Sequence, residues 1–134
     1  MKIHHVAISV RDLERSAEFY RRFFGFREVN RFERKDLKWK SLFMESDGIC
    51  IELWQFENII ANKDDFLNLA ILGIKHIAFG VLDVDKKYAE LKSKGLDVEK
   101  PRMGASGGRY CFLKDPDGFP IEIYQVHEDA KRLS

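Results

Sequence analysis

The sequence is poor in the features that would tie it to an oxidising compartment, a membrane or a polyanion. It has only two cysteines, Cys50 and Cys111, without CxxC spacing, so we expect reduced thiols and a cytoplasmic protein. Its apolar runs are too short to cross a bilayer. The 23 Lys and Arg residues balance the 22 Asp and Glu residues, so the charge gives no reason to expect a nucleic acid or a membrane as a partner.

The residues that are present predict one folded domain. The chain has 134 residues, of which 45% are hydrophobic. That content is typical of a globular protein, and the length is too small for two conventional domains. We therefore expect a single domain over residues 1–134.

Two stretches of the sequence repeat one another about 70 residues apart, a period that indicates duplicated structural modules. The segment 5–13 matches the segment 76–84, with identical His, Ala, Val and Asp residues. Further matches join the first half to the second: 47–48 to 117–118, and 51–53 to 121–123. The repeat predicts a first module over 1–56, a linker over 57–72, a second module over 73–126 and a C-terminal tail over 127–134.

The sequence pattern of each module predicts the element order βαβββ. The whole chain is therefore expected to have an α+β fold. Alternation of apolar residues predicts a first strand in each half, over about 2–10 and 74–82. Asp12 and Asp83 stand at N-cap positions, and Gly25 and Gly95 stand where helices end, so a helix follows each first strand. The remaining strands are expected over about 27–34, 39–46, 49–56, 97–100, 109–114 and 119–126.

The linker is unusually apolar for a connecting segment. Asp64 and Asp65 precede several Leu, Ile and Phe residues, which predicts a short capped helix. Such a helix could pack on the domain, cover a pocket or lie in a dimer interface. The sequence leaves these three alternatives open.

Four polar side chains share the sheet face that does not meet the helices. Residues two apart in a strand point to the same side, which places His5, Glu52, His76 and Glu122 opposite the large aliphatic residues of their strands. A single strand histidine or glutamate is usually a core or surface residue, but these four occupy repeat-equivalent positions. Two imidazoles and two carboxylates suit one divalent metal ion, Zn²⁺, Ni²⁺, Co²⁺, Mn²⁺ or Fe²⁺. We therefore predict a metal site.

Other polar residues give weaker indications of a site. Alternation directs His4 away from His5, and His127 falls in the charged tail, where a solvated side chain is the default. The loop 103–109 lacks the spacing of a nucleotide-binding loop. Arg102 and Arg109 could still hold an anionic group of a substrate.

Over residues 2–126 the sequence resembles the vicinal oxygen chelate (glyoxalase/bleomycin resistance/dioxygenase) superfamily, and within it glyoxalase I most closely. The resemblance rests on His5 and His76 at the module starts, Glu52 between Ile51 and Leu53, and Glu122 after the segment 115–118. It implies two tandem βαβββ modules that form a cupped, curved mixed sheet around the metal. It also implies a homodimer.

The resemblance implies a metal-dependent lyase or isomerase that acts on a small-molecule substrate. In glyoxalase I (lactoylglutathione lyase), the metal stabilises an enediolate-like charge while the hemithioacetal of methylglyoxal and glutathione becomes a thioester of lactate. By that resemblance Glu122 is the base that carries the proton, and Glu52 is the alternative.

Two positions depart from the glyoxalase I pattern. Ser9 stands where an arginine usually binds glutathione, and Phe56 stands where an asparagine is usual. Trp54, Phe56 and Tyr124 therefore predict a pocket for a more apolar or planar substrate than glutathione. Alternatives within the superfamily are a methylmalonyl-CoA epimerase-like enzyme, an extradiol dioxygenase-like enzyme and a non-catalytic small-molecule-binding protein. Glu52 argues against the first two, and the intact ligand set against the third.

Overall fold

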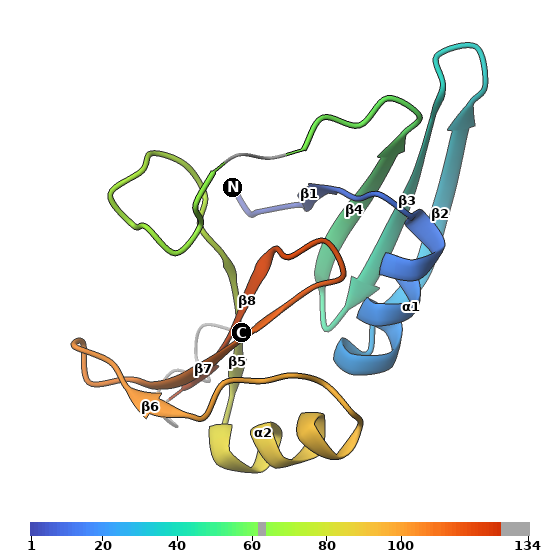
Figure 1. Ribbon diagram of the computed structural model, residues 1–134. Helices are drawn as coiled ribbons and strands as arrows, with labels where there is room; N and C mark the ends of the chain where they lie inside the picture. The colour runs from blue at the N-terminus through green and yellow to red at the C-terminus, as the bar shows by residue number, and fades with distance from the viewer. Residues whose placement is uncertain (62–63, 127–134) are drawn as a thin grey trace. The chain divides into compact units, whose positions relative to one another are not determined.

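The computed structural model describes residues 1–61 and 64–126, and the chain forms two compact units, Met1–Lys63 and Asp64–Ser134. Each unit contains one four-stranded sheet and one helix (Figure 1). The unit boundary falls inside the predicted linker, so its second part belongs with the second module. The predicted tail 127–134, which includes His127, lies outside the described residues.

The first unit has the predicted βαβββ order. Strand β1 (Val6–Ser9) pairs in parallel with β4 (Ile49–Phe56), which pairs in antiparallel fashion with β3 (Trp39–Ser46). Strand β2 (Arg27–Arg34) completes the sheet, and its order is β1-β4-β3-β2. Helix α1 (Leu13–Phe24) connects β1 to β2.

The second unit repeats this topology and confirms the α+β assignment. Its elements follow the order β5 (Ile77–Val81), α2 (Val84–Ser93), β6 (Arg102–Met103), β7 (Arg109–Lys114) and β8 (Pro120–Gln125). The sheet order is β5-β8-β7-β6, with β5 parallel to β8 and the other pairs antiparallel. The duplication read from the sequence is therefore a duplication of the fold.

The caps predicted from the sequence fix where each helix begins. Asp12 accepts a hydrogen bond from the Arg15 N–H at 3.1 Å, and Asp83 accepts one from the Lys86 N–H at 2.9 Å. Gly25 ends α1 with a φ of 68°, a left-handed conformation that glycine adopts without steric penalty. The carboxylate caps satisfy backbone N–H groups that would otherwise lack a partner in the first turn.

Three expectations about the secondary structure were wrong. Residues 97–100 form no strand beyond a single bridge between Val98 and Leu113, and the short strand lies at Arg102–Met103 instead. Pro101 lacks the N–H that a continuous ladder would need. The first strands also begin later than expected, so that His4 and His5 precede β1.

The capped helix predicted in the linker is the third of these errors. Residues 64–73 form turns and bends instead. The Asp65 side chain accepts the Leu67 N–H at 3.0 Å, and the Asn68 side chain accepts the Ala70 N–H at 3.1 Å. These local side-chain bonds compete with helical hydrogen bonds, as Asp and Asn commonly do.

The apolar core of each unit lies between its sheet and its helix. In the first unit Leu13 and Tyr20 of α1 are fully buried, as are Leu42 and Leu53 of the sheet. In the second unit the buried apolar residues are Val84, Leu91, Val98, Cys111, Leu113, Ile121 and Ile123. Burial of about 25 cal/mol per Å² of apolar surface fixes these strand faces inward, so alternate residues must point to the other face. Of the helices in residues 1–61 and 64–126, none has the length and hydropathy that a bilayer crossing needs.

Candidate metal centre

The first unit brings His5 and Glu52 together. Glu52 lies in the middle of β4, between Ala7 of β1 and Phe43 of β3. Its Oε2 atom is 3.4 Å from Nε2 of His5, and the exposed fractions of the two side chains are 10% and 35%. The His5 ring meets Phe43 edge to face, with centroids 5.2 Å apart. A largely buried carboxylate thus faces an imidazole that an aromatic ring holds in place.

The second unit repeats this arrangement with His76 and Glu122. Glu122 lies in β8 between Ala78 and Phe112, and its Oε2 is 3.1 Å from Nε2 of His76. The exposed fractions are 15% for Glu122 and 31% for His76. The His76 ring contacts Phe112 edge to face, again with centroids 5.2 Å apart. The predicted repeat therefore extends to the geometry of the polar side chains.

The donor atoms in these pairs fit a divalent cation. Each pair offers one imidazole nitrogen and one carboxylate oxygen, the ligands that Zn²⁺ and similar ions accept. A carboxylate held away from water is unfavourable unless a cation or hydrogen bonds compensate its charge. Within residues 1–61 and 64–126, no group of three or more His, Cys, Asp or Glu side chains gathers for a metal, so each unit by itself offers two donors.

Phe43 and Phe112 were not found from the sequence as site residues. Each is the cross-strand neighbour of the glutamate in its unit. The turns at 47–48 and 115–119 set the register of the antiparallel strands on either side. Pairing residues one by one from each turn would have predicted Phe43 opposite Glu52 and Phe112 opposite Glu122. Their rings restrict the histidines to orientations that face the carboxylates.

His4 lies beside His5, whereas alternation predicted that it points away. The Nδ1 atoms of the two rings are 2.8 Å apart, and the rings meet edge to face. The prediction failed because both residues precede β1, where strand alternation does not apply. In the second unit Lys75 precedes His76, and its Nζ lies 3.2 Å from both carboxylate oxygens of Asp64.

Aromatic residues continue the Glu52 face along β4. Trp54 stacks on Phe56 with an interplanar angle of 17° and centroids 5.9 Å apart, and its ring is 4.8 Å from that of Trp39. Ser9, on the neighbouring strand, is the register partner of Trp54. Phe56 remains 42% exposed. This part of the first unit offers flat apolar surface and little charge.

Tyr124 occupies the corresponding face of the second unit and packs directly on the backbone of Gly108. A Cβ atom at Gly108 would lie 2.2 Å from the Tyr124 hydroxyl oxygen and 2.5 Å from two ring carbons. Tyr110 is its cross-strand neighbour. Only a glycine leaves room for the tyrosine ring in this position.

Arg109 lies on the other side of the β7 strand. It alternates with Tyr110 and shares its face with Cys111 and Leu113, which are buried in the core. Its guanidinium donates two hydrogen bonds to the Asp85 carboxylate of α2, at 2.8 and 2.7 Å. The structure therefore brings Arg109 to Asp85 and not to Glu122.

This ion pair perturbs both partners. The Arg109 guanidinium lowers the pKa of the Asp85 carboxyl below its ordinary value, and the carboxylate raises the pKa of Arg109. Arg102, the other arginine suggested as an anion ligand, donates to the Tyr110 hydroxyl at 3.1 Å. Both arginines are thus engaged within their own unit.

Comparisons with known proteins agree with this fold. Residues 2–123 match the Glyoxalase/Bleomycin resistance protein/Dioxygenase superfamily. A probable lactoylglutathione lyase of Vibrio parahaemolyticus is 31% identical over 141 aligned positions, which cover 98% of this chain and 96% of that protein. The Bacillus subtilis protein YwkD is 33% identical over 125 positions, covering 92% and 95%. The crystal structure of a glyoxalase family protein from Enterococcus faecalis is 27% identical, with a TM-score of 0.82, and the match covers 92% of this chain and 96% of that one.

Proposed function

The chain belongs to the Glyoxalase/Bleomycin resistance protein/Dioxygenase superfamily, and we propose that it is a divalent-metal-dependent lyase or isomerase of the glyoxalase I type. The observation that carries the proposal is the repeated imidazole–carboxylate pair, with separations of 3.4 Å for His5–Glu52 and 3.1 Å for His76–Glu122. The similarity to a probable lactoylglutathione lyase supports the reaction class.

Each pair would supply one imidazole and one carboxylate as ligands of the proposed metal ion. When bound, a divalent cation acts as a Lewis acid that makes a carbon–hydrogen bond next to a coordinated oxygen more acidic. His5 and His76 would bind the ion through Nε2, the ring nitrogen that faces the carboxylate in each pair. The Phe43 and Phe112 rings keep those imidazoles oriented and exclude water from one side.

Glu122 is the better placed of the two glutamates to move a proton. By the resemblance to glyoxalase I, Glu122 would be the carboxylate that exchanges the proton, and its side chain is 15% exposed against 10% for Glu52. In this role its carboxylate takes a proton from one carbon and returns it to the neighbouring carbon. Glu52, which is more buried in the middle of its sheet, serves as a lasting ligand.

The aromatic surface favours a substrate with an apolar or planar group. Trp54 and Phe56 form a flat stack on the Glu52 face, and Ser9 beside them carries no charge to bind a carboxylate. Glutathione is an anionic peptide and would need cationic partners. Arg109, which the sequence suggested as a ligand for an anionic group, is already paired with Asp85.

A metal-binding and proton-exchange experiment tests this proposal. The purified protein should retain a divalent ion after dialysis, and Glu52→Gln should lose affinity by more than about tenfold. With the metal removed, Glu52→Gln should be as stable as the wild type or more stable, because a buried charge is gone. Glu122→Gln should still bind metal but lose exchange of the substrate proton with solvent deuterium, measured on hemithioacetals of methylglyoxal and phenylglyoxal.

The control is Glu99→Gln, at an exposed carboxylate that lies outside both pairs. It should match the wild type in metal content, stability and exchange. A wild-type protein that retains no more metal than Glu52→Gln would refute the metal site. A metal-loaded protein that exchanges no proton with either adduct would refute the reaction.

A further inference from the structure

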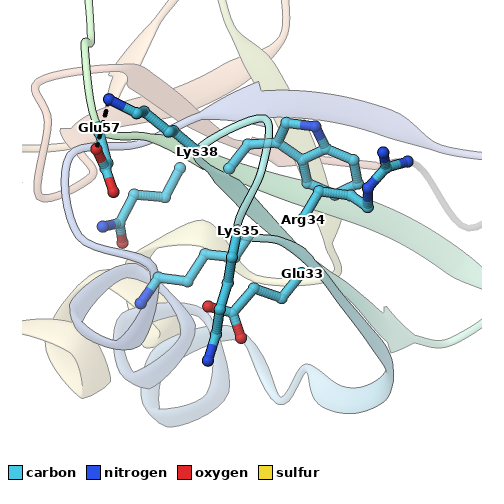
Figure 2. A pocket seen from close by; sticks show the side chains of 8 residues that line it. Glu33, Arg34, Lys35, Lys38 and Glu57 are labelled. Atoms are coloured by element: carbon cyan, nitrogen blue, oxygen red, sulfur yellow. Dashed lines mark ion pairs between the residues drawn. The ribbon is translucent and has the colours of Figure 1, made fainter.

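A cavity of about 430 Å³ lies in the first unit, at the end of the hairpin formed by β2 and β3 (Figure 2). The residues that line it are mostly charged: Glu33, Arg34, Lys35, Lys38, Trp39, Lys40, Gln55 and Glu57. Four of the eight side chains are cationic and two are anionic. The lining is therefore suited to a ligand that carries negative charge.

This cavity is separate from the metal centre. Lys40 and Gln55 are register partners on β3 and β4, and they alternate with residues of the Glu52 face. Gln55 points to the helix side, where its Oε1 accepts the N–H of Leu13 at 2.7 Å. The part of the cavity that Lys40 and Gln55 line thus lies beside the start of α1, on the face of the sheet opposite Glu52, whereas Trp39 belongs to the Glu52 face. The bond to Leu13 leaves the Gln55 amide N–H groups as donors.

Two of the four cations already have carboxylate partners. Arg34 donates to both oxygens of Asp36 at 2.9 and 2.7 Å. The Nζ atom of Lys38 lies 3.9 Å from Glu57, as the dashed line in Figure 2 marks. Among the described residues, neither Lys35 nor Lys40 has a carboxylate oxygen within 4.0 Å. These two ammonium groups are the cations available to a ligand.

In the second unit, the residue equivalent to Lys40 has its positive charge neutralised within the unit. There the register partner of Gln125 would be Arg109, and Gln125 accepts the first N–H of α2, as Gln55 does for α1. Arg109 is held by Asp85, the second residue of α2. The second unit therefore closes its equivalent site with an internal ion pair.

The first unit lacks that closure because its equivalent acid is taken elsewhere. Glu14, the second residue of α1, binds Arg31, which also donates to Glu28 at 2.9 Å. The Lys40 charge acts on Glu14 only as a minor influence that adds to the Arg31 effect in lowering the Glu14 pKa. Because Glu14 pairs with Arg31, Lys40 lacks the ion pair that its equivalent, Arg109, forms with Asp85.

We propose that this cavity is a second small-molecule site, which binds a phosphate-bearing ligand through Lys35 and Lys40. A phosphate group provides several strong acceptor oxygens for the two ammonium groups and the Gln55 amide. Trp39 also lines the cavity, but its ring packs on Trp54 on the Glu52 face, so the phosphate group alone accounts for the proposed contacts. Lys40 and Gln55 point away from the Glu52 face, so binding through them does not need the metal centre.

Titration of the full chain with inorganic pyrophosphate tests the proposal. The measurement is amide NMR in metal-free protein at constant ionic strength, which removes non-specific charge effects. We expect saturable shifts confined to residues 33–40 and 55–57. The double variant Lys35→Gln/Lys40→Gln should bind about tenfold or more weakly, as expected for losing charge-assisted hydrogen bonds.

Two further variants sharpen the result. Arg31→Gln leaves the cavity lining intact but frees Glu14 to pair with Lys40, so it should also weaken binding. Lys100→Gln, at an exposed lysine of the second unit, should bind like the wild type. The proposal is overturned if the wild type shows no saturable shifts, or if Lys100→Gln loses as much affinity as the double variant.

Discussion

Nδ1 of His4 lies 2.8 Å from Nδ1 of His5, close enough to share one hydrogen bond. This contact bears on the metal centre because His5 presents its other ring nitrogen, Nε2, to Glu52. A metal ligand through Nε2 must carry its proton on Nδ1. His4 then supplies the acceptor for that proton and fixes the ring, as outer partners of ligating histidines usually do.

His4→Ala should weaken divalent metal binding by about tenfold, because the His5 ring loses the partner of its Nδ1 atom. Competition with a chromophoric chelator measures the affinity for Zn²⁺. Lys2→Ala, a change at an exposed residue of the same segment, is the control and should have no effect. Equal affinities in His4→Ala and the wild type would show that the contact does not support His5.

Gly108→Ala should reduce the free energy of unfolding by about 1–3 kcal/mol, the usual cost of forcing an extra methyl group into a packed site. The new Cβ atom would overlap the Tyr124 side chain, whose nearest ring carbons would be 2.5 Å away. Denaturant unfolding measures the change. Ser106→Ala, in the same loop but exposed, should be nearly neutral.

A double variant separates this clash from a general effect on the loop. In a Tyr124→Leu background, Gly108→Ala should destabilise the protein much less, because the overlapping ring is absent. A cost that is the same in both backgrounds would mean that Tyr124 is not the cause.

Arg109→Gln should raise the pKa of Asp85 toward its ordinary value, since the guanidinium bonds that lower it are lost. A carboxyl group whose pKa is lowered by folding stabilises the folded state above its unfolded pKa and loses that effect as the pH falls through the folded value. The variant should therefore be less stable than the wild type at neutral pH, and the difference should vanish in acid.

The carboxyl ¹³C shift of Asp85, followed through an acid titration, measures this pKa. Arg102→Gln is the matched control, because Arg102 binds Tyr110 instead. It should leave the Asp85 titration unchanged. An unaltered Asp85 titration in Arg109→Gln would contradict the assigned pairing.

The two cysteines should differ in reactivity. Burial raises the pKa of the Cys111 thiol to about 11, and Cys111 is only 1% exposed. Cys50 is half-buried, and burial raises its pKa as well. Because the thiolate is the reactive form, iodoacetamide at pH 8 should alkylate Cys50 first and Cys111 only after unfolding. Peptide mass mapping reads both sites, and alkylation of Cys111 in the folded protein would contradict the prediction.

The sequence by itself determined the repeat, the order of elements and the residues on each strand face. These features depend on local chemistry: Asp12 and Asp83 cap helices through bonds to the next turn, and alternation separates Glu52 from the aliphatic residues beside it. The two glutamates lie on the strand face that alternation predicted, whereas His5 and His76 precede β1 and β5 and meet the glutamates from outside the strands. The capped helix predicted after Asp64 was wrong because side-chain bonds within the turns replace helical ones.

Only the tertiary structure decided which charged groups meet. The sequence suggested Arg109 as a possible ligand for a substrate anion, and the packing of α2 brings Asp85 to it. In the first unit Arg31 takes the equivalent acid, Glu14, and leaves Lys40 available. Long charged side chains can reach several partners at similar cost, so strand periodicity cannot select among them. A different reason applies to His4: it contacts His5 because both residues precede β1, where strand alternation does not set the direction of a side chain.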